Sequence, residues 1–133
     1  MFSFCIPTEF VFGSGSFKKL YQYRMPGKKA LIVTTNGGSV KRLGYLNELE
    51  KQLEKSDVSF EVFDGIEPNP ITDNIMAAAA KGKETNCDFV IGFGGGSPMD
   101  SAKLIALAAT NPGNIWDYCQ KGTGGRKQPE NTP

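Results

Sequence analysis

Short apolar runs alternate along the chain with longer segments in which apolar residues recur every three or four positions. The runs predict strands, and two of them, Ala30–Thr35 and Phe89–Phe93, are apolar at consecutive positions, as in a buried parallel sheet. Ser59–Phe63 instead alternates apolar and polar residues, which predicts a strand nearer an edge. Two further short runs, Phe2–Ile6 and Phe10–Phe12, are separated by a turn-like tripeptide and predict an N-terminal β-hairpin.

The segments between these runs carry helical signals. Helices are expected over Phe17–Tyr23, from about Val40 to Lys55, over an Ala-rich segment that ends near Asn86, and over Pro98–Thr110. In the second of these, one face is formed by leucines: Leu43, Leu46, Leu49 and Leu53. The three main strands begin about 30 residues apart, the length of a βα unit. The chain is therefore expected to be α/β, a Rossmann-like parallel sheet with helices on both faces, preceded by the hairpin.

The loops that follow the three main strands are rich in Gly and Asn. They are Asn36–Ser39, Asp64–Thr72 and Gly94–Ser97. Right-handed connections between parallel strands place all three loops at the same edge of the sheet. Ligands of open α/β sheets bind at the carboxyl ends of the strands, so these loops are expected to line one crevice.

Three consecutive glycines end the run Phe89–Phe93, and a helix start follows at once. Ser97 is expected to be the N-cap, Pro98 suits the first helical position, and Asp100 fits a capping box. A glycine turn before a helix N-terminus exposes backbone N–H groups to an anion, which predicts a nucleotide site. The P-loop and the G-x-G-x-x-G pattern are both absent. The alternative is that the glycines only turn the chain.

The segment Gly94–Lys103 resembles the G-G-G-S-x-x-D-x-A-K signature of the iron-containing (group III) alcohol dehydrogenases. Phe10–Gly15 resembles the opening hairpin of that family, Glu67–Pro70 its second cofactor loop, and Asn114–Tyr118 the segment after its glycine-rich helix. The resemblance spans nearly the whole chain. It implies that residues 1–133 are the N-terminal cofactor-binding domain of a longer enzyme. That enzyme would interconvert primary alcohols and aldehydes by hydride transfer.

The expected cofactor-binding residues follow from the positions of the three loops and from the resemblance to the family. Backbone N–H groups of Gly95, Gly96 and Ser97 are expected to hold the pyrophosphate. Asp100 either caps the helix or contacts the cofactor, and Asn69 either contacts the cofactor or forms an Asx-turn that serves only its loop. The complete expected set of cofactor-binding residues is Gly37, Gly38, Ser39, Asn69, Gly94, Gly95, Gly96, Ser97, Pro98 and Asp100.

The loop after the first main strand bears on the choice of cofactor. An NAD-specific enzyme typically places a carboxylate there, whereas this loop has no acid and is followed by Lys41 and Arg42. It resembles the G-G-G-S-[IV]-K loop of the NADP-using butanol dehydrogenase branch, with Asn36 in place of the first glycine. NADP(H) is therefore expected, with NAD(H) the alternative; the two basic residues could also be solvated helix positions.

Catalytic groups are missing from the sequence. It contains no histidine, so histidine general-base chemistry and histidine metal ligands are excluded within these 133 residues. The resembled family holds a divalent metal, Fe²⁺ or Zn²⁺, with one Asp and three His in a C-terminal helical domain, and none of these ligands has a counterpart here. The polar segment 122–133 is expected to be an exposed loop where the enzyme is truncated. This segment of the enzyme alone is expected to be inactive.

Composition narrows the remaining classes. Fifteen Lys and Arg balance fourteen Asp and Glu, which predicts no nucleic-acid partner. No apolar run is long enough for a membrane span, and with three scattered cysteines the cytosol is the expected compartment. A homodimer through the N-terminal hairpin is a further expectation, against a monomer with the hairpin folded back. Two alternative functions remain: a glycerol-dehydrogenase-like or dehydroquinate-synthase-like enzyme on the same scaffold, and a stand-alone nucleotide-binding module without catalysis.

Overall fold

The structure, a computed structural model, describes residue 1 and residues 8–36 and 38–131. Helices and strands alternate through the middle of the chain, as the apolar pattern predicts. In chain order the elements are η1 (Ser16–Gln22), β1 (Lys29–Thr35), α1 (Ser39–Arg42), α2 (Tyr45–Lys55), β2 (Ser59–Ile66), α3 (Thr72–Glu84), β3 (Phe89–Gly92), α4 (Gly96–Thr110) and η2 (Ile115–Tyr118).

The strands form one parallel sheet in the order β2-β1-β3. Ala30 of the central strand pairs with Phe60 on one side and with Phe89 on the other. Strand β1 is buried on both faces because its apolar residues are consecutive, and Ala30 to Val33 are at most 1% exposed. Its partner β2 lies at an edge of the described sheet, as its alternating pattern predicts. The three main strands predicted from the sequence are found. Strand β3, which was predicted to be buried, is only half-buried, because it lies at the other edge of the described sheet and no described strand covers its second side.

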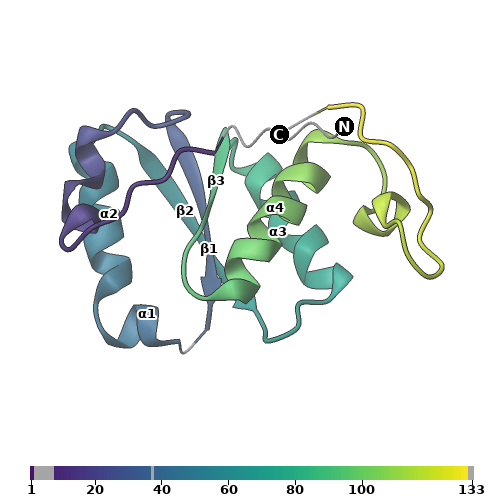
Figure 1. The fold of residues 1–133 in the computed structure, drawn as a ribbon, viewed down its shortest axis with the longest axis horizontal. Coiled ribbons are helices and arrows are strands. Elements are labelled where there is room, and N and C mark those ends of the chain that lie inside the picture. Colours follow the sequence, from purple (N-terminus) through teal and green to yellow (C-terminus); the bar gives the residue numbers. More distant parts are fainter. Residues whose placement is uncertain (2–7, 37, 132–133) are drawn as a thin grey trace.

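Helices cover both faces of the sheet, which confirms the predicted Rossmann-like layers. In Figure 1, α1 and α2 lie on one side of the strands, and α3 and α4 lie on the other. Successive side chains of a strand point to opposite faces, so Leu31 and Val33 pack with α3 and α4, and Ala30 and Ile32 pack with α1 and α2. The sheet is thus held between two apolar cores.

The predicted second strand of the N-terminal hairpin, Phe10–Phe12, is not found. Phe10–Phe12 forms no strand, and the side chains of Phe10 and Phe12 are 80% and 102% exposed. The predicted first strand, Phe2–Ile6, lies outside the described residues. A short apolar run becomes a strand only where a partner supplies backbone hydrogen bonds and a covered face, and Phe10–Phe12 has neither among the described residues.

The two helices before β2 also differ from their predictions. The helix expected over Phe17–Tyr23 is a 3-10 helix, η1, which begins at Ser16 after Gly15 in the left-handed region. The single helix expected over Val40–Lys55 is divided into α1 and α2 at Gly44, whose φ is 75°. Because the chain turns at Gly44, Leu43 leaves the leucine face and is 59% exposed.

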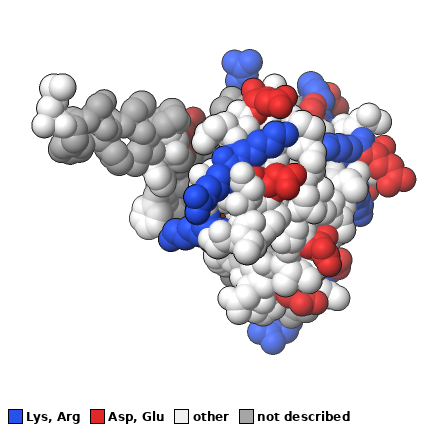
Figure 2. All heavy atoms as spheres, turned by 90° about the vertical axis from the view of Figure 1, so that its right-hand side faces the viewer, with Lys and Arg blue, Asp and Glu red and all other residues white. Residues whose placement is uncertain are grey.

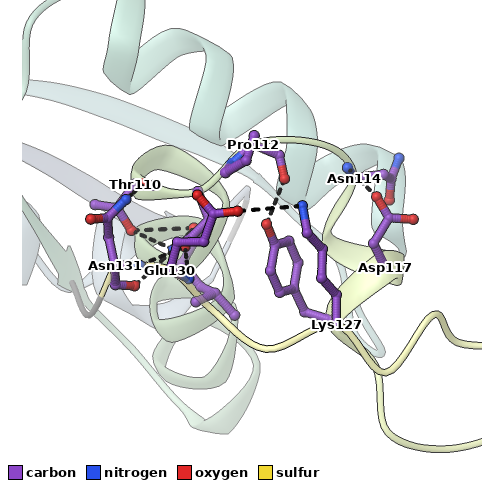
Figure 3. A network of polar contacts seen from close by, with 10 residues as sticks. Thr110, Pro112, Asn114, Asp117, Lys127, Glu130 and Asn131 are labelled. Atoms are coloured by element: carbon purple, nitrogen blue, oxygen red, sulfur yellow. Dashed lines mark hydrogen bonds and ion pairs between the residues drawn. The ribbon is translucent and has the colours of Figure 1, made fainter.

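The C-terminal segment is largely exposed, but hydrogen bonds hold it against the end of α4. The buried side chain of Asn111 accepts from the backbone N–H groups of Glu130 and Asn131, at 2.8 and 2.9 Å, and its Nδ2 donates to the Asn131 carbonyl oxygen. Nearby, the Tyr118 hydroxyl donates to the Pro112 carbonyl oxygen (Figure 3). Exposure of this segment was predicted; its attachment through Asn111 was not.

Candidate functional site

The loops that follow the three strands lie at one edge of the sheet, the lower edge in Figure 1. Residues of the first and second loops, among them Asn36, Gly38 and Pro68, line one pocket of about 400 Å³. A Cβ placed on Gly94, in the third loop, would lie 3.6 Å from Val40 at the start of α1. The predicted crevice therefore has its first loop at the centre, with the other two on either side.

The glycine loop leaves open space in front of α4. A Cβ placed on Gly95 or on Gly96 would have no heavy atom of the rest of the protein within 4 Å. Both residues are exposed, and in the described part of the chain no hydrogen bond takes the N–H groups of Gly94 to Ser97. Gly96 and Ser97 are the first two residues of the 15-residue helix α4, whose dipole favours an anion at its N-terminus.

The start of α4 corrects three predictions, for Ser97, Pro98 and Asp100. Gly95, in an extended conformation, is the N-cap residue in place of Ser97, and no side chain caps the helix. Asp100 therefore does not form a capping box; its carboxylate accepts from the Lys103 ammonium at 3.2 Å instead. Pro98 is the third helical residue and is buried. It fits there because N–H groups in the first turn need no helical acceptor.

Close approach rather than ligand binding explains part of the glycine pattern. Gly94 has φ of 141°, and a Cβ there would lie 2.9 Å from the Pro98 ring. Glycine is thus required at position 94 by the backbone itself. Gly95 has φ of −78° and open space, so neither backbone conformation nor packing within the chain requires glycine at that position.

The first loop is only partly described. Gly37 lies outside the described residues, Gly38 is the N-cap of α1, and Ser39 is the first residue of that short helix. A Cβ at Gly38 would lie 2.6 Å from the Thr35 hydroxyl oxygen, so a side chain there would require the Thr35 hydroxyl to move. The second loop places Asn69 between two prolines, exposed and in the left-handed region with φ of 58°.

A carboxylate that the sequence analysis did not select lies beside the first loop. The Lys41 ammonium donates to Asp64 Oδ2, and this hydrogen bond holds the pKa of Asp64 below its ordinary value. Sequence analysis assigned Asp64 to a turn, whereas it belongs to β2, which continues to Ile66. The available signal was its position: an acid near the carboxyl end of β2, the strand that pairs with β1, which the first loop follows.

Comparison with known proteins identifies the family. A profile described as "Iron-containing alcohol dehydrogenase" matches residues 7–133. The chain belongs to this family.

Named relatives include enzymes that use either cofactor. The chain is 35% identical over 120 residues to "Probable NADH-dependent butanol dehydrogenase 1" of Bacillus subtilis, covering 90% of this chain and 31% of that protein. It is 38% identical over 128 residues to "NADPH-dependent aldehyde reductase YqhD" of Escherichia coli, covering 95% and 32%. The crystal structure of NADH-dependent butanol dehydrogenase A from Thermotoga maritima aligns with a TM-score of 0.88 at 31% identity, covering 99% and 32%. The chain spans about a third of the length of each.

The metal that gives the iron-containing family its name does not fit the residues of this chain. The sequence has no histidine, and residues 1, 8–36 and 38–131 contain no group of three Cys, Asp or Glu side chains arranged to hold an ion. No step of a metal-assisted reaction is therefore assigned to these residues. The candidate site in the described residues is therefore the edge of the sheet at which the three loops lie.

On the face seen in Figure 2, Lys and Arg side chains are interspersed with Asp and Glu. No described helix of this iron-containing alcohol dehydrogenase chain is long and apolar enough to cross a membrane.

Proposed function

We propose that this chain binds a nicotinamide dinucleotide across the three loops at the carboxyl edge of the sheet. The pyrophosphate lies over Gly95 and Gly96 and accepts hydrogen bonds from the backbone N–H groups of Gly95, Gly96 and Ser97. The observation that carries this proposal is the open space in front of both glycines at the N-terminus of α4, where a Cβ would meet nothing. An ordinary connector at these two positions would not need glycine.

The remaining expected residues take supporting roles. Gly94 and Pro98 shape the loop, because the Pro98 ring packs where a Cβ on residue 94 would lie. Gly37, Gly38 and Ser39 contact the adenosine ribose from the first loop, and Asn69 does so from the second. Asp100, one turn into α4 and 73% exposed, faces the bound phosphates only through solvent or a bridging cation, since its own charge is negative.

NADP(H) is the cofactor we favour over NAD(H). The support is that the first loop itself carries no acid, while Lys41 follows it and donates to Asp64, which lines the pocket between the first and second loops. Both NADH-dependent and NADPH-dependent enzymes stand among the relatives, so the choice depends on this chain's own residues.

The enzyme to which these residues contribute transfers a hydride between a small primary alcohol or aldehyde and the cofactor. A bound divalent metal supplies Lewis-acid polarisation of the alcohol or carbonyl oxygen in such chemistry. Its ligands must come from outside these 133 residues. The share of this chain is to bind and orient the dinucleotide, so the chain alone binds cofactor without turning over substrate.

A second copy of the chain is the partner we propose for the N-terminal region. Phe10, Val11 and Phe12 are 80%, 45% and 102% exposed, an apolar stretch of a kind that marks association surfaces. Sedimentation of the wild-type chain and of Phe12→Ser tests this, since a dimer that Phe12→Ser dissociates is expected and a monomeric wild-type chain contradicts it.

Calorimetric titration with NADPH and NADH tests the cofactor site. Wild-type chain is expected to bind both, and Gly95→Val is expected to bind neither, because the added side chain fills the space above the loop. The variant should fold normally, since the φ of Gly95 is −78° and its Cβ position is open. Ala80→Val, at an exposed position of α3, is the matched control and should bind as wild type does.

Two results would contradict the proposed site. One is a wild-type chain that binds neither dinucleotide at millimolar concentration. The other is a folded Gly95→Val variant whose affinity equals that of the wild type.

A further inference from the structure

Lys41 and Asp64 join the loop after β1 to the end of β2. The Lys41 ammonium donates to Asp64 Oδ2, and the two side chains are 33% and 46% exposed. Lys41 belongs to α1 and Asp64 to β2, so the contact exists only because the parallel pairing of β1 with β2 brings the two segments together. Each of the two charged groups is therefore paired with the other.

The same carboxylate lines the pocket between the first and second loops. Its other lining residues include Thr35 at the end of β1, Asn36 and Gly38 of the first loop, and Glu67 of the second. Two carboxylates, Asp64 and Glu67, thus line the pocket, and the Lys41 ammonium, which does not line it, is already paired with Asp64. A pocket with this balance of charge suits a neutral polyhydroxyl group at least as well as a dianion.

We propose that Asp64 determines cofactor selectivity in this chain: by holding Lys41 in an ion pair at the ribose pocket, it limits the preference for NADPH over NADH. The inference rests on the proposed function, since it requires a dinucleotide whose adenosine ribose lies at the first loop. Asp64 is a positioning residue for Lys41 and, with NADH, a direct acceptor for the ribose.

The two cofactors meet this ion pair differently. The 2′-phosphate of NADPH must share the Lys41 ammonium with Asp64 and lies close to a second negative charge. The 2′-hydroxyl of NADH instead donates to a carboxylate, the interaction by which dinucleotide-binding folds select NAD. Because the hydrogen bond from Lys41 holds the pKa of Asp64 below its ordinary value, the carboxylate is ionised at neutral pH. Both effects of Asp64 therefore favour NADH.

Removal of the carboxylate is compatible with folding. An exposed ion pair contributes little to stability, because solvent screens it and two long side chains must be ordered. Asp64→Asn keeps the shape of the side chain and an oxygen acceptor for Lys41 while it removes the negative charge. A change in selectivity can then be separated from a change in fold by measuring Tm on the same samples.

The test is a double-mutant cycle of binding constants. The Kd values for NADPH and NADH are measured by calorimetry for wild type, Asp64→Asn, Lys41→Met and the double variant. Asp57→Asn is the matched control, because it removes one negative charge from a different, largely exposed ion pair with Lys28.

Asp64→Asn is expected to shift the ratio of the two Kd values about tenfold toward NADPH, within the usual range of coupling between charged groups. Lys41→Met is expected to shift the ratio toward NADH, and Asp57→Asn should leave it unchanged. In the Lys41→Met background, the effect of Asp64→Asn should be smaller than in the wild type, since the part that acts through the Lys41 ammonium is gone and only the direct effect of the carboxylate on the ribose or its phosphate remains.

The failures of the two proposals differ. A wild-type chain that binds neither dinucleotide overturns the proposed function. A chain that binds both but keeps its ratio in Asp64→Asn, or shifts toward NADH, overturns the role of Asp64. An undiminished effect of Asp64→Asn in the Lys41→Met background overturns the coupling through Lys41.

Discussion

Gly92, the last residue of β3, lies directly against Ala102 in α4: a Cβ on Gly92 would be 2.9 Å from the Ala102 Cβ. It would be equally close to the Met99 Cα and the Pro98 carbonyl oxygen. Both of these are backbone atoms of the first turns of α4, so they cannot move aside without the helix. Glycine at position 92 therefore fixes how closely α4, and with it the glycine loop, approaches the sheet.

Gly92→Ala is expected to lower the free energy of unfolding by about 1–3 kcal/mol, because the added methyl group forces strand and helix apart. Urea unfolding followed by circular dichroism measures this change. Gly96→Ala is the control, since a Cβ there meets nothing, and it should stay within about 1 kcal/mol of wild type. Equal losses in the two variants would show that close packing at Gly92 is not what distinguishes them.

Strands were predictable from the sequence where several consecutive residues are apolar, because such a run indicates a buried strand. Ala30 to Val33 are consecutive apolar residues, and only a strand covered on both faces hides them all. Phe10–Phe12 carries a similar local signal but forms no strand, because a strand also needs a neighbour that sequence does not name. Apolar runs thus predicted β1 and β3 better than they predicted the structure of the N-terminal region.

The candidate site divides in the same way. Gly95 and Gly96 were predictable, since three consecutive glycines before a helix indicate a purpose beyond turning the chain. Asp64 was not, because its contact with Lys41 joins positions 23 residues apart through the pairing of β1 with β2. A charge pair between a helix that follows one strand and the end of the neighbouring strand depends on sheet order, which no single segment specifies.

Leu43 and Leu49 make the error in the predicted second helix testable. Both fit the same leucine periodicity, yet Leu43 is 59% exposed and Leu49 is 1% exposed, because the left-handed Gly44 turns the chain between them. Leu49→Ala is expected to cost about 2–5 kcal/mol of unfolding free energy. Leu43→Ala should change it by less than about 0.5 kcal/mol, as is usual at the surface. Guanidinium unfolding of both variants decides between a divided and a continuous helix, since a continuous helix would make the losses similar.

Asn111→Ala is expected to release the C-terminal segment. The variant loses the acceptor of the Glu130 and Asn131 N–H groups and the donor to the Asn131 carbonyl oxygen, from a side chain in a buried residue. The expected loss of unfolding free energy is about 1–3 kcal/mol. Amide hydrogen exchange of Glu130 and Asn131 should also become faster.

Asn131→Ala provides the comparison for Asn111, since its side chain makes one exposed hydrogen bond, to the Thr110 carbonyl oxygen (Figure 3). It should change stability by less than about 0.5 kcal/mol. Unchanged exchange at Glu130 and Asn131 in Asn111→Ala would contradict the assigned role of Asn111.

Asp88 is expected to give the fold an acid-sensitive contribution at the amino-terminal edge of the sheet. Its carboxylate accepts from the backbone N–H groups of Lys28 and Lys29, at 2.8 and 2.9 Å, and these two hydrogen bonds lower the pKa of Asp88. With the pKa lower in the folded state, the unfolded chain binds more protons in acid. The contribution is therefore complete above the unfolded pKa of about 3.9 and is lost as the pH falls through the lower folded pKa.

The difference in unfolding free energy between wild type and Asp88→Asn, measured from pH 6 to pH 3, should shrink in that window. A difference that stays constant to pH 3 would show that the charge of Asp88 plays no part. Asp57→Asn serves as the control because it removes a carboxylate that pairs with the Lys28 ammonium and not with a backbone N–H group.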